Sequence, residues 1–119
     1  MRLDAALASL PRGKRPGSDG LPYEFYMSFW AVVGPPLLHV FSEAFSVQHE
    51  KPCLPESMRI GSIVLLYKDS RDRALVHNYR PISLLNADYM VFAKALALRF
   101  GTHLASVVGE TQTAFLPGR

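Results

Sequence analysis

Four basic side chains near the middle of the chain could together bind phosphate. They are Lys68, Arg71, Arg73 and Arg80, and a polar stretch between two apolar runs holds them. An arginine guanidinium can donate two parallel hydrogen bonds to a phosphate, and a lysine ammonium adds a compact charge. A β-hairpin would bring all four cations near one place. These residue types therefore fit a triphosphate or a nucleic-acid backbone.

The same cations also have a structural explanation. Charged residues on loops are usually solvated, and Asp69 and Asp72 partly neutralise the stretch that contains Arg71 and Arg73. The two aspartates lie among arginines on a loop, where contacts with those arginines compete with metal binding. The spacing alone therefore leaves both explanations open.

A second glycine-rich, basic segment, PRGKRPGSDG, covers residues 11–20. Glycines can let backbone amides approach a phosphate, but this segment has no Walker pattern and no buried strand before it. Asp19 followed by Gly20 is typical of a turn in which the carboxylate binds its own backbone. Taken alone, the segment is interpreted as a connecting loop.

Other chemistries find little support. The histidines at 39, 49, 77 and 103 have no metal-ligand spacing, so we expect them to be structural or exposed. Cys53 is the single cysteine and can form no internal disulfide. We find no catalytic carboxylate pair.

The elements that must position the cations follow from hydrophobic spacing. We expect a short helix over 3–10, a helix over 22–33 that ends at Gly34, and another helix that begins near Pro35 and frays around His49.

The central apolar run predicts a hairpin. Ile63 to Tyr67 is expected to form a strand buried on both faces, and Pro81 holds Arg80 extended at the beginning of a partner strand. Asn86 is a plausible N-cap of a final helix, and Gly101 is expected to bend or end that helix.

Length and composition limit the kinds of fold and partner that the chain can have. The chain has 119 residues, of which 49% are hydrophobic, and its net charge is +3. This suits one compact domain with a core, and it permits an anionic partner without demanding one. Gly34, Pro35 and Pro36 break the longest charge-free stretch, so we expect no membrane span. The opening apolar stretch is too short for a signal peptide, which predicts an intracellular protein.

Four segments match, in order and spacing, a pattern known from one family: RPGSDGLPYEFY, LPESMRIGSIVLLYK, NYRPISLLNADYMVFAKALALRF and ETQTAFLPGR. In them, from about Leu10 to the last residue, the chain resembles the reverse transcriptase domain of LINE-type non-LTR retrotransposons. Tyr67 stands where that family usually has proline, and Ala114 where it usually has glycine. The resemblance implies an α/β fold, part of a right-hand polymerase, in which several helices surround a two-stranded antiparallel fingers hairpin.

The resemblance also implies roles for single residues. Lys68 and Arg80 are expected to bind the triphosphate of the incoming nucleotide. The residues that the resemblance implies lie along the template are Gly17, Asp19, Gly20, Gln112, Phe115, Pro117, Gly118 and Arg119. Arg71 and Arg73, from the basic stretch described above, are also expected to bind nucleic acid.

Partners and cofactors follow from the same resemblance. A complete family enzyme uses an RNA template, a DNA primer, dNTP and Mg²⁺ held by palm aspartates, which the pattern places after Arg119. Residues 1–119 are thus interpreted as one partial domain, the fingers and the start of the palm, without the palm active site, thumb or endonuclease. We expect this chain alone to bind no metal, to be inactive, and to bind nucleic acid weakly without sequence preference. Two alternatives stay open: a non-catalytic nucleic-acid-binding module, and a relic without function.

Such a fragment would also leave uncovered the surface that packs against the missing palm and thumb. We therefore expect an exposed apolar patch at Phe92, Leu96 and Phe100, or at Phe115 and Leu116.

Overall fold

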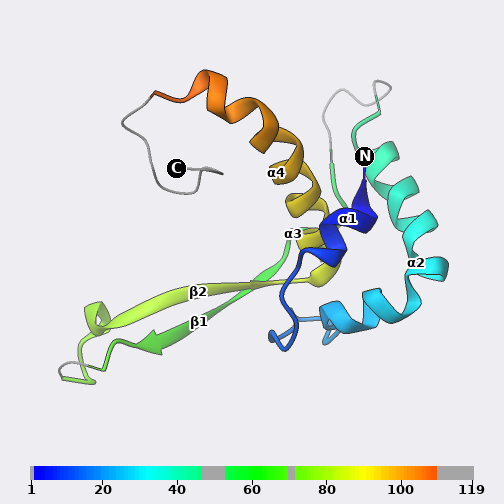
Figure 1. Cartoon of the computed structure of the whole chain (residues 1–119). Coiled ribbons are helices and arrows are strands. Elements are labelled where there is room, and N and C mark those ends of the chain that lie inside the picture. The colour runs from blue at the N-terminus through cyan, green and yellow to red at the C-terminus, as the bar shows by residue number, and fades with distance from the viewer. Residues whose placement is uncertain (1, 47–52, 70–71, 110–119) are drawn as a thin grey trace.

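The computed structural model describes residues 2–46, 53–69 and 72–109, which form a helical body and a projecting hairpin (Figure 1). In chain order the elements are α1 (Leu3–Ala8), α2 (Tyr23–Ala44), α3 (Glu56–Arg59), β1 (Gly61–Tyr67), a 3₁₀ turn η1 (Val76–Asn78), β2 (Tyr79–Leu85) and α4 (Ala87–Val107). Helices combined with a two-stranded antiparallel hairpin confirm the expected α/β class.

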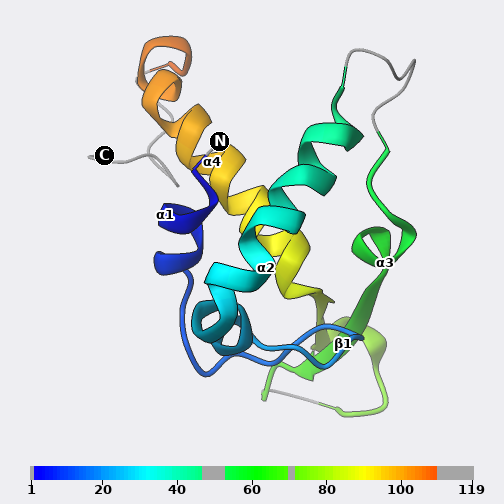
Figure 2. The ribbon, with the colours of Figure 1, turned by 90° about the vertical axis from the view of Figure 1, so that its right-hand side faces the viewer.

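The core of the helical body forms where α1, α2 and α4 meet (Figure 2). In α1 the buried residues Leu3, Ala6 and Leu7 recur at helical spacing. A helix of six residues is unstable by itself, so its packing against α2 and α4 stabilises it. From α2 and α4, Phe41 and Phe92 meet with ring centroids 4.5 Å apart.

Helix α2 continues through Gly34, Pro35 and Pro36, so the prediction that one helix ends at Gly34 was wrong. The break lies earlier, at Phe29, whose φ of −110° and ψ of 17° are not helical, and Figure 1 shows the bend. A proline ring crowds the carbonyl four residues before it, so the helix can adjust on the N-terminal side of the prolines.

Helix α2 is also long and apolar enough, by length and composition, to cross a membrane. In the fold, however, its Tyr26 and Phe41 side chains belong to the core formed with α1 and α4. Only 17% of its apolar window is buried, so core packing accounts for a small part of that window. The expectation of no membrane partner stays a prediction.

Strands β1 and β2 pair antiparallel, from Gly61 opposite Leu85 to Tyr67 opposite Tyr79. Arg80 is the second residue of β2, close to the strand beginning expected for it. The expected burial of β1 on both faces was wrong, because Ile63 is 69% exposed and Leu65 and Leu66 are about half exposed. The hairpin projects from the helices, and no described element covers either of its faces (Figure 1).

Helix α4 follows β2 directly, with Asn86 at its N-cap position as expected. The helix runs through Gly101 to Val107, so Gly101 does not end it. One helical glycine costs about 1 kcal/mol relative to alanine, which neighbouring residues can offset. Of the expected exposed patch, Phe100 is exposed, but Phe92 is buried in the core and Leu96 is half-buried. Phe115 and Leu116 lie outside the described residues.

Candidate nucleic-acid interface

Lys68 and Arg80 lie on the same face of the hairpin, at the end away from the helical body. Arg80 is opposite Leu66 in the register, and opposite residues share a face. Lys68 is two residues beyond Leu66, and its backbone N–H continues the ladder by donating to the Asn78 carbonyl at 2.8 Å. Because side chains alternate between faces with a period of two, Lys68 also lies on that face.

The hydrogen bonds of these two cations leave donors for a ligand. The Lys68 Nζ donates to the His77 carbonyl oxygen at 2.8 Å, which fixes the ammonium and leaves its other two N–H groups. The exposed Arg80 guanidinium makes no hydrogen bond or ion pair with any other residue that the structure describes. Both cations therefore keep N–H donors that a phosphate group can accept at this end of the hairpin.

Arg73 lies on the opposite face. Its Cζ is 5.0 Å from the centroid of the Tyr67 ring, and Tyr67 and Tyr79 form a cross-strand aromatic pair. The Tyr79 hydroxyl also donates to the Arg73 carbonyl oxygen at 3.0 Å. Arg73 thus lies at the same end of the hairpin as Lys68 and Arg80 but on the other face, and Arg71 lies outside the described residues.

The turn end of the hairpin is held by its own polar groups. The Asp72 carboxylate accepts the Ala74 N–H at 2.9 Å, and the amide of the buried Asn78 donates to the Asp72 carbonyl at 2.7 Å. In the described part of the turn, Asp72 thus acts as a turn residue and not as an ion-pair partner of an arginine. This bonding fixes the backbone next to Lys68 and Arg80.

The glycine-rich loop lies at the other end of the hairpin. The Gly20 N–H donates to the Gly17 carbonyl at 3.2 Å, and the Leu21 N–H donates to the Asp19 carboxylate at 3.0 Å, which confirms the expected turn. Gly20 has a φ of +74°, which favours glycine. A Cβ on Gly17 would be 2.6 Å from the Asn86 backbone nitrogen and 2.7 Å from the Leu85 carbonyl carbon. The loop therefore packs against the end of β2 only because residue 17 is glycine.

Asn86 joins this loop to the hairpin and to α3. Its Oδ1 accepts hydrogen bonds from the Asp19 N–H at 3.3 Å and the Ser18 hydroxyl at 3.4 Å, and its Nδ2 donates to the Ser57 carbonyl at 2.9 Å. Asn86 is buried, and its side chain does not cap α4. The sequence did not indicate this role, because asparagine is common at helix N-caps and the N-cap position already explained its presence at residue 86.

Two acidic side chains, Asp19 and Asp88, lie at this junction. Burial raises the pKa of Asp88, and the charge of Asp19 raises it further. Burial, with the charges of Asp88 and Asp19, raises the pKa of Tyr26 to about 12. A first-turn acid normally benefits from the helix dipole, but for Asp88 burial outweighs that benefit. Two carboxylates at the junction make it a poor phosphate site.

The loop also attaches to the beginning of α2. The Gly13 N–H donates to the Glu24 carboxylate at 2.6 Å, and this bond is the main reason that the pKa of Glu24 is lowered. Lys14 and Arg15 are exposed beside this bond. A strand of seven residues spans about 20 Å, so these cations are separated from Lys68 by roughly the length of the hairpin.

The other predicted contacts, Gln112, Phe115, Pro117, Gly118 and Arg119, lie outside the described residues. The structure therefore places the predicted residues at two sites. Lys68 and Arg80 are at the turn end of the hairpin, whereas Gly17, Asp19 and Gly20 are at its base.

No family model matches the chain. Over 117 residues, 98% of its length, the chain is 43% identical to a Xenopus laevis protein named "Transposon TX1 uncharacterized 149 kDa protein". The match spans about 9% of that relative. This similarity supports an origin in a transposon.

Proposed function

We propose that this transposon-related chain is the fingers part of a reverse transcriptase of a LINE-type non-LTR retrotransposon. In this proposal its task is to bind phosphate, on an incoming nucleoside triphosphate and on the adjacent nucleic-acid backbone. The metal-dependent chemistry would be performed by the palm of the complete enzyme, with its Mg²⁺, RNA template and DNA primer.

The observation that carries this proposal is the arrangement of Lys68 and Arg80. The two cations share one face at the turn end of the hairpin, and Arg80 has no protein partner among the described residues. Cations placed this way can balance charge on a phosphate during phosphoryl transfer. The motifs in the sequence point to the same pair.

Arg73 is expected to contribute less than Arg80. Its guanidinium already stacks on Tyr67 on the other face, so binding a phosphate beside Lys68 would require it to leave that ring. Arg80 has no such contact to lose in the described structure.

A salt titration of single-stranded RNA binding tests the proposal. We expect Arg80→Ala and Lys68→Ala each to weaken binding by about fivefold and to flatten the salt dependence by about one released ion, for all RNA sequences alike. Arg73→Ala should have a smaller effect. Arg99→Ala, which removes the same charge from the exposed side of α4, is the matched control.

A competition experiment separates triphosphate binding from general nucleic-acid binding. Inorganic tripolyphosphate should displace RNA from the wild type more effectively than from Arg80→Ala. Equal displacement from both proteins would favour a simple nucleic-acid-binding module over a nucleotide site. Salt-independent RNA binding, or an Arg80→Ala variant that behaves like Arg99→Ala, would reject both and leave the basic hairpin as a solvated surface.

A further inference from the structure

The outer edge of β1 offers main-chain groups to a further strand. In the described part of the chain β1 pairs only with β2, and the hairpin points away from the helical body (Figure 1). Ile63, Leu65 and Leu66 are half exposed or more, and the strand carries no charge that would repel a neighbour. An added strand would gain both hydrogen bonds and apolar contact there.

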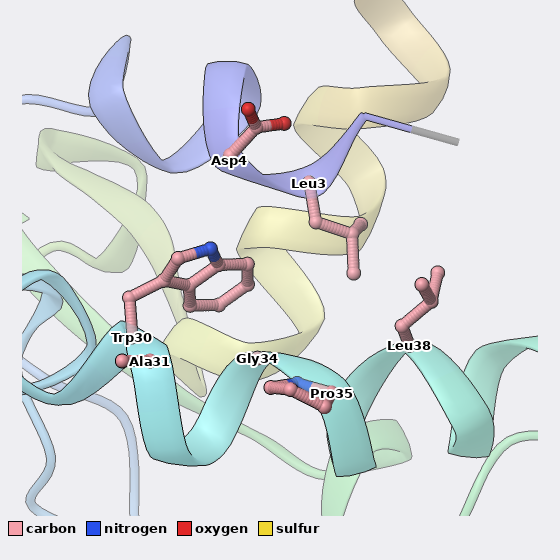
Figure 3. A pocket seen from close by; sticks show the side chains of 7 residues that line it. All are labelled: Leu3, Asp4, Trp30, Ala31, Gly34, Pro35 and Leu38. Carbon is pink, nitrogen blue, oxygen red and sulfur yellow. The ribbon is translucent and has the colours of Figure 1, made fainter.

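The groove between α1 and α2 is another apolar surface, but it selects no partner. Figure 3 shows Leu3, Trp30 and Leu38 around it, with the Asp4 carboxylate pointing away. The main-chain groups inside a helix bond to one another, so this groove offers apolar contact without directional hydrogen bonds. The edge of β1, in contrast, fixes the direction and register of whatever pairs with it.

The hydrogen bonds between β1 and β2 determine which residues face the outer edge. The Lys68 N–H points toward β2, since it donates to the Asn78 carbonyl. N–H and C=O groups alternate between the two sides of a strand, so those of Val64 also point toward β2. Pro81, opposite Leu65, agrees with this alternation, because its missing N–H would point outward. In the middle of β1, the residues that point their main-chain groups away from β2 are therefore Ile63 and Leu65.

This arrangement allows β1 to pair with itself. Val64 is the middle residue of Gly61–Tyr67, so an antiparallel pair of two copies about a two-fold axis at Val64 overlaps the whole strand. Ile63 of one copy then lies opposite Leu65 of the other. Both residues point their N–H and C=O outward, so each such pair exchanges two main-chain hydrogen bonds. An axis at Ile63 or at Leu65 would shorten the overlap.

The positions of the charges are compatible with this register. Lys68 would lie opposite Ile60 of the second copy, so the two Lys68 residues would be separated by roughly eight residues of strand, or about 27 Å. Arg80 lies on β2, which would be the outer strand. The pairing therefore brings no like charges opposite each other.

We propose that β1 pairs with β1 of a second copy of this chain, antiparallel about Val64, to form a continuous sheet in the order β2–β1–β1–β2. Opposite residues share a face, so Ile63 packs against Leu65 of the other copy. The same rule places Lys68 and Arg80 of both copies on one face, where a single RNA could contact both pairs of cations. That last consequence rests on the proposed function, whereas the pairing itself does not.

Single-cysteine variants test the register. Cys53, the single cysteine, is first replaced by serine. Val64→Cys then places two thiols opposite each other at a non-hydrogen-bonded position, where Cα atoms are about 4.5 Å apart and a disulfide fits. Leu66→Cys, on the same face, is the matched control, because the two copies of residue 66 would be about 14 Å apart along the strands. In a glutathione buffer, Val64→Cys should form about tenfold more disulfide-linked dimer than Leu66→Cys.

Sedimentation equilibrium of the Cys53→Ser chain measures the association itself. Ile63→Lys should raise the dissociation constant of the dimer by about tenfold, because the two-fold axis makes each dimer lose two cross-strand pairs. Ser83→Lys, opposite Ile63 on β2, adds the same charge to the same face and is the matched control. Leu38→Lys adds it to the groove shown in Figure 3. Both variants should associate like the Cys53→Ser chain.

Circular dichroism of each variant checks that the fold is kept. A chain that stays monomeric up to about 1 mM would overturn the proposal and leave the edge of β1 to a strand from another protein. Equal disulfide formation by Val64→Cys and Leu66→Cys would reject the register. Loss of association in Leu38→Lys but not in Ile63→Lys would assign the contact to the groove instead. The measurements contain no RNA, so their result is independent of the function proposed for the hairpin.

Discussion

Replacing Asn86 by alanine tests whether one buried side chain joins the three parts of the chain that meet at the base of the hairpin. The change removes the acceptor for the Asp19 N–H and the Ser18 hydroxyl, and the donor to the Ser57 carbonyl. Asn86 is 3% exposed, so water cannot easily replace these bonds. The glycine loop and α3 should both loosen.

The expected loss follows from these contacts. A hydrogen bond contributes about 1 kcal/mol net, and a buried group left without a partner costs about 1–3 kcal/mol. The Ser18 bond, at 3.4 Å, is long and contributes little. We therefore expect Asn86→Ala to lower the free energy of unfolding by about 2–3 kcal/mol.

Urea unfolding measured by circular dichroism provides the test. Ser83→Ala, an exposed position on β2, is the control and should change stability by less than about 0.5 kcal/mol. Asn86→Asp keeps the acceptor but adds a carboxylate beside Asp19 and Asp88, so its destabilisation should be larger at pH 7 than at pH 4. If Asn86→Ala unfolds at the same urea concentration as Ser83→Ala, the three bonds make no net contribution and the reasoning fails.

Three further predictions follow from the same region and from the proposed function. Gly17→Ala should destabilise the chain more than Gly20→Ala in urea unfolding, because a Cβ at residue 17 would clash with backbone atoms. At residue 20 a Cβ has open space around it, and only the positive φ costs about 1–2 kcal/mol. Equal losses of stability would contradict the packing of the loop. Burial raises the pKa of Asp88, so the folded chain retains a proton that the unfolded chain releases, and ionisation of Asp88 costs stability as pH rises above 3.8. Asp88→Asn should therefore be more stable than the wild type at pH 7, and this difference in stability should disappear below pH 3.8. A difference in the urea midpoint that is constant with pH, or that has the opposite sign, would contradict this prediction. The purified 119-residue chain should not extend a DNA primer on an RNA template with Mg²⁺. Incorporation of nucleotides above a no-protein control would contradict the proposal that the palm performs the metal-dependent chemistry.

Much of the secondary structure could be predicted from the sequence because local signals agree there. The spacing of apolar residues after Asn86 predicts α4, and the run before Lys68 together with Pro81 predicts the hairpin. Two of the failed predictions depended on tertiary contacts that the local sequence does not show. Gly34 precedes two prolines yet lies inside α2, where Trp30 packs on it.

The other failure concerns β1. An apolar run predicts burial only if something covers it, and nothing in the local sequence shows what that partner is. For the candidate site, the types of Lys68 and Arg80 were informative, but their shared face depends on the register. That register depends on how η1 and Asp72 fold the turn, which the spacing of residues does not reveal.

The exposed hairpin has a consequence for how the purified chain behaves at high concentration. A two-stranded sheet has two open edges, each a template for another strand. The outer edge of β2 is interrupted by Pro81, which has no N–H, and carries the charge of Arg80. Strand β1, with the sequence GSIVLLY, carries no charge and no proline. We therefore expect the sheet to grow along β1, either by self-association or by addition of a strand from another protein. The substitution Ile63→Lys, at an exposed position of β1, is best suited to keep the chain in solution.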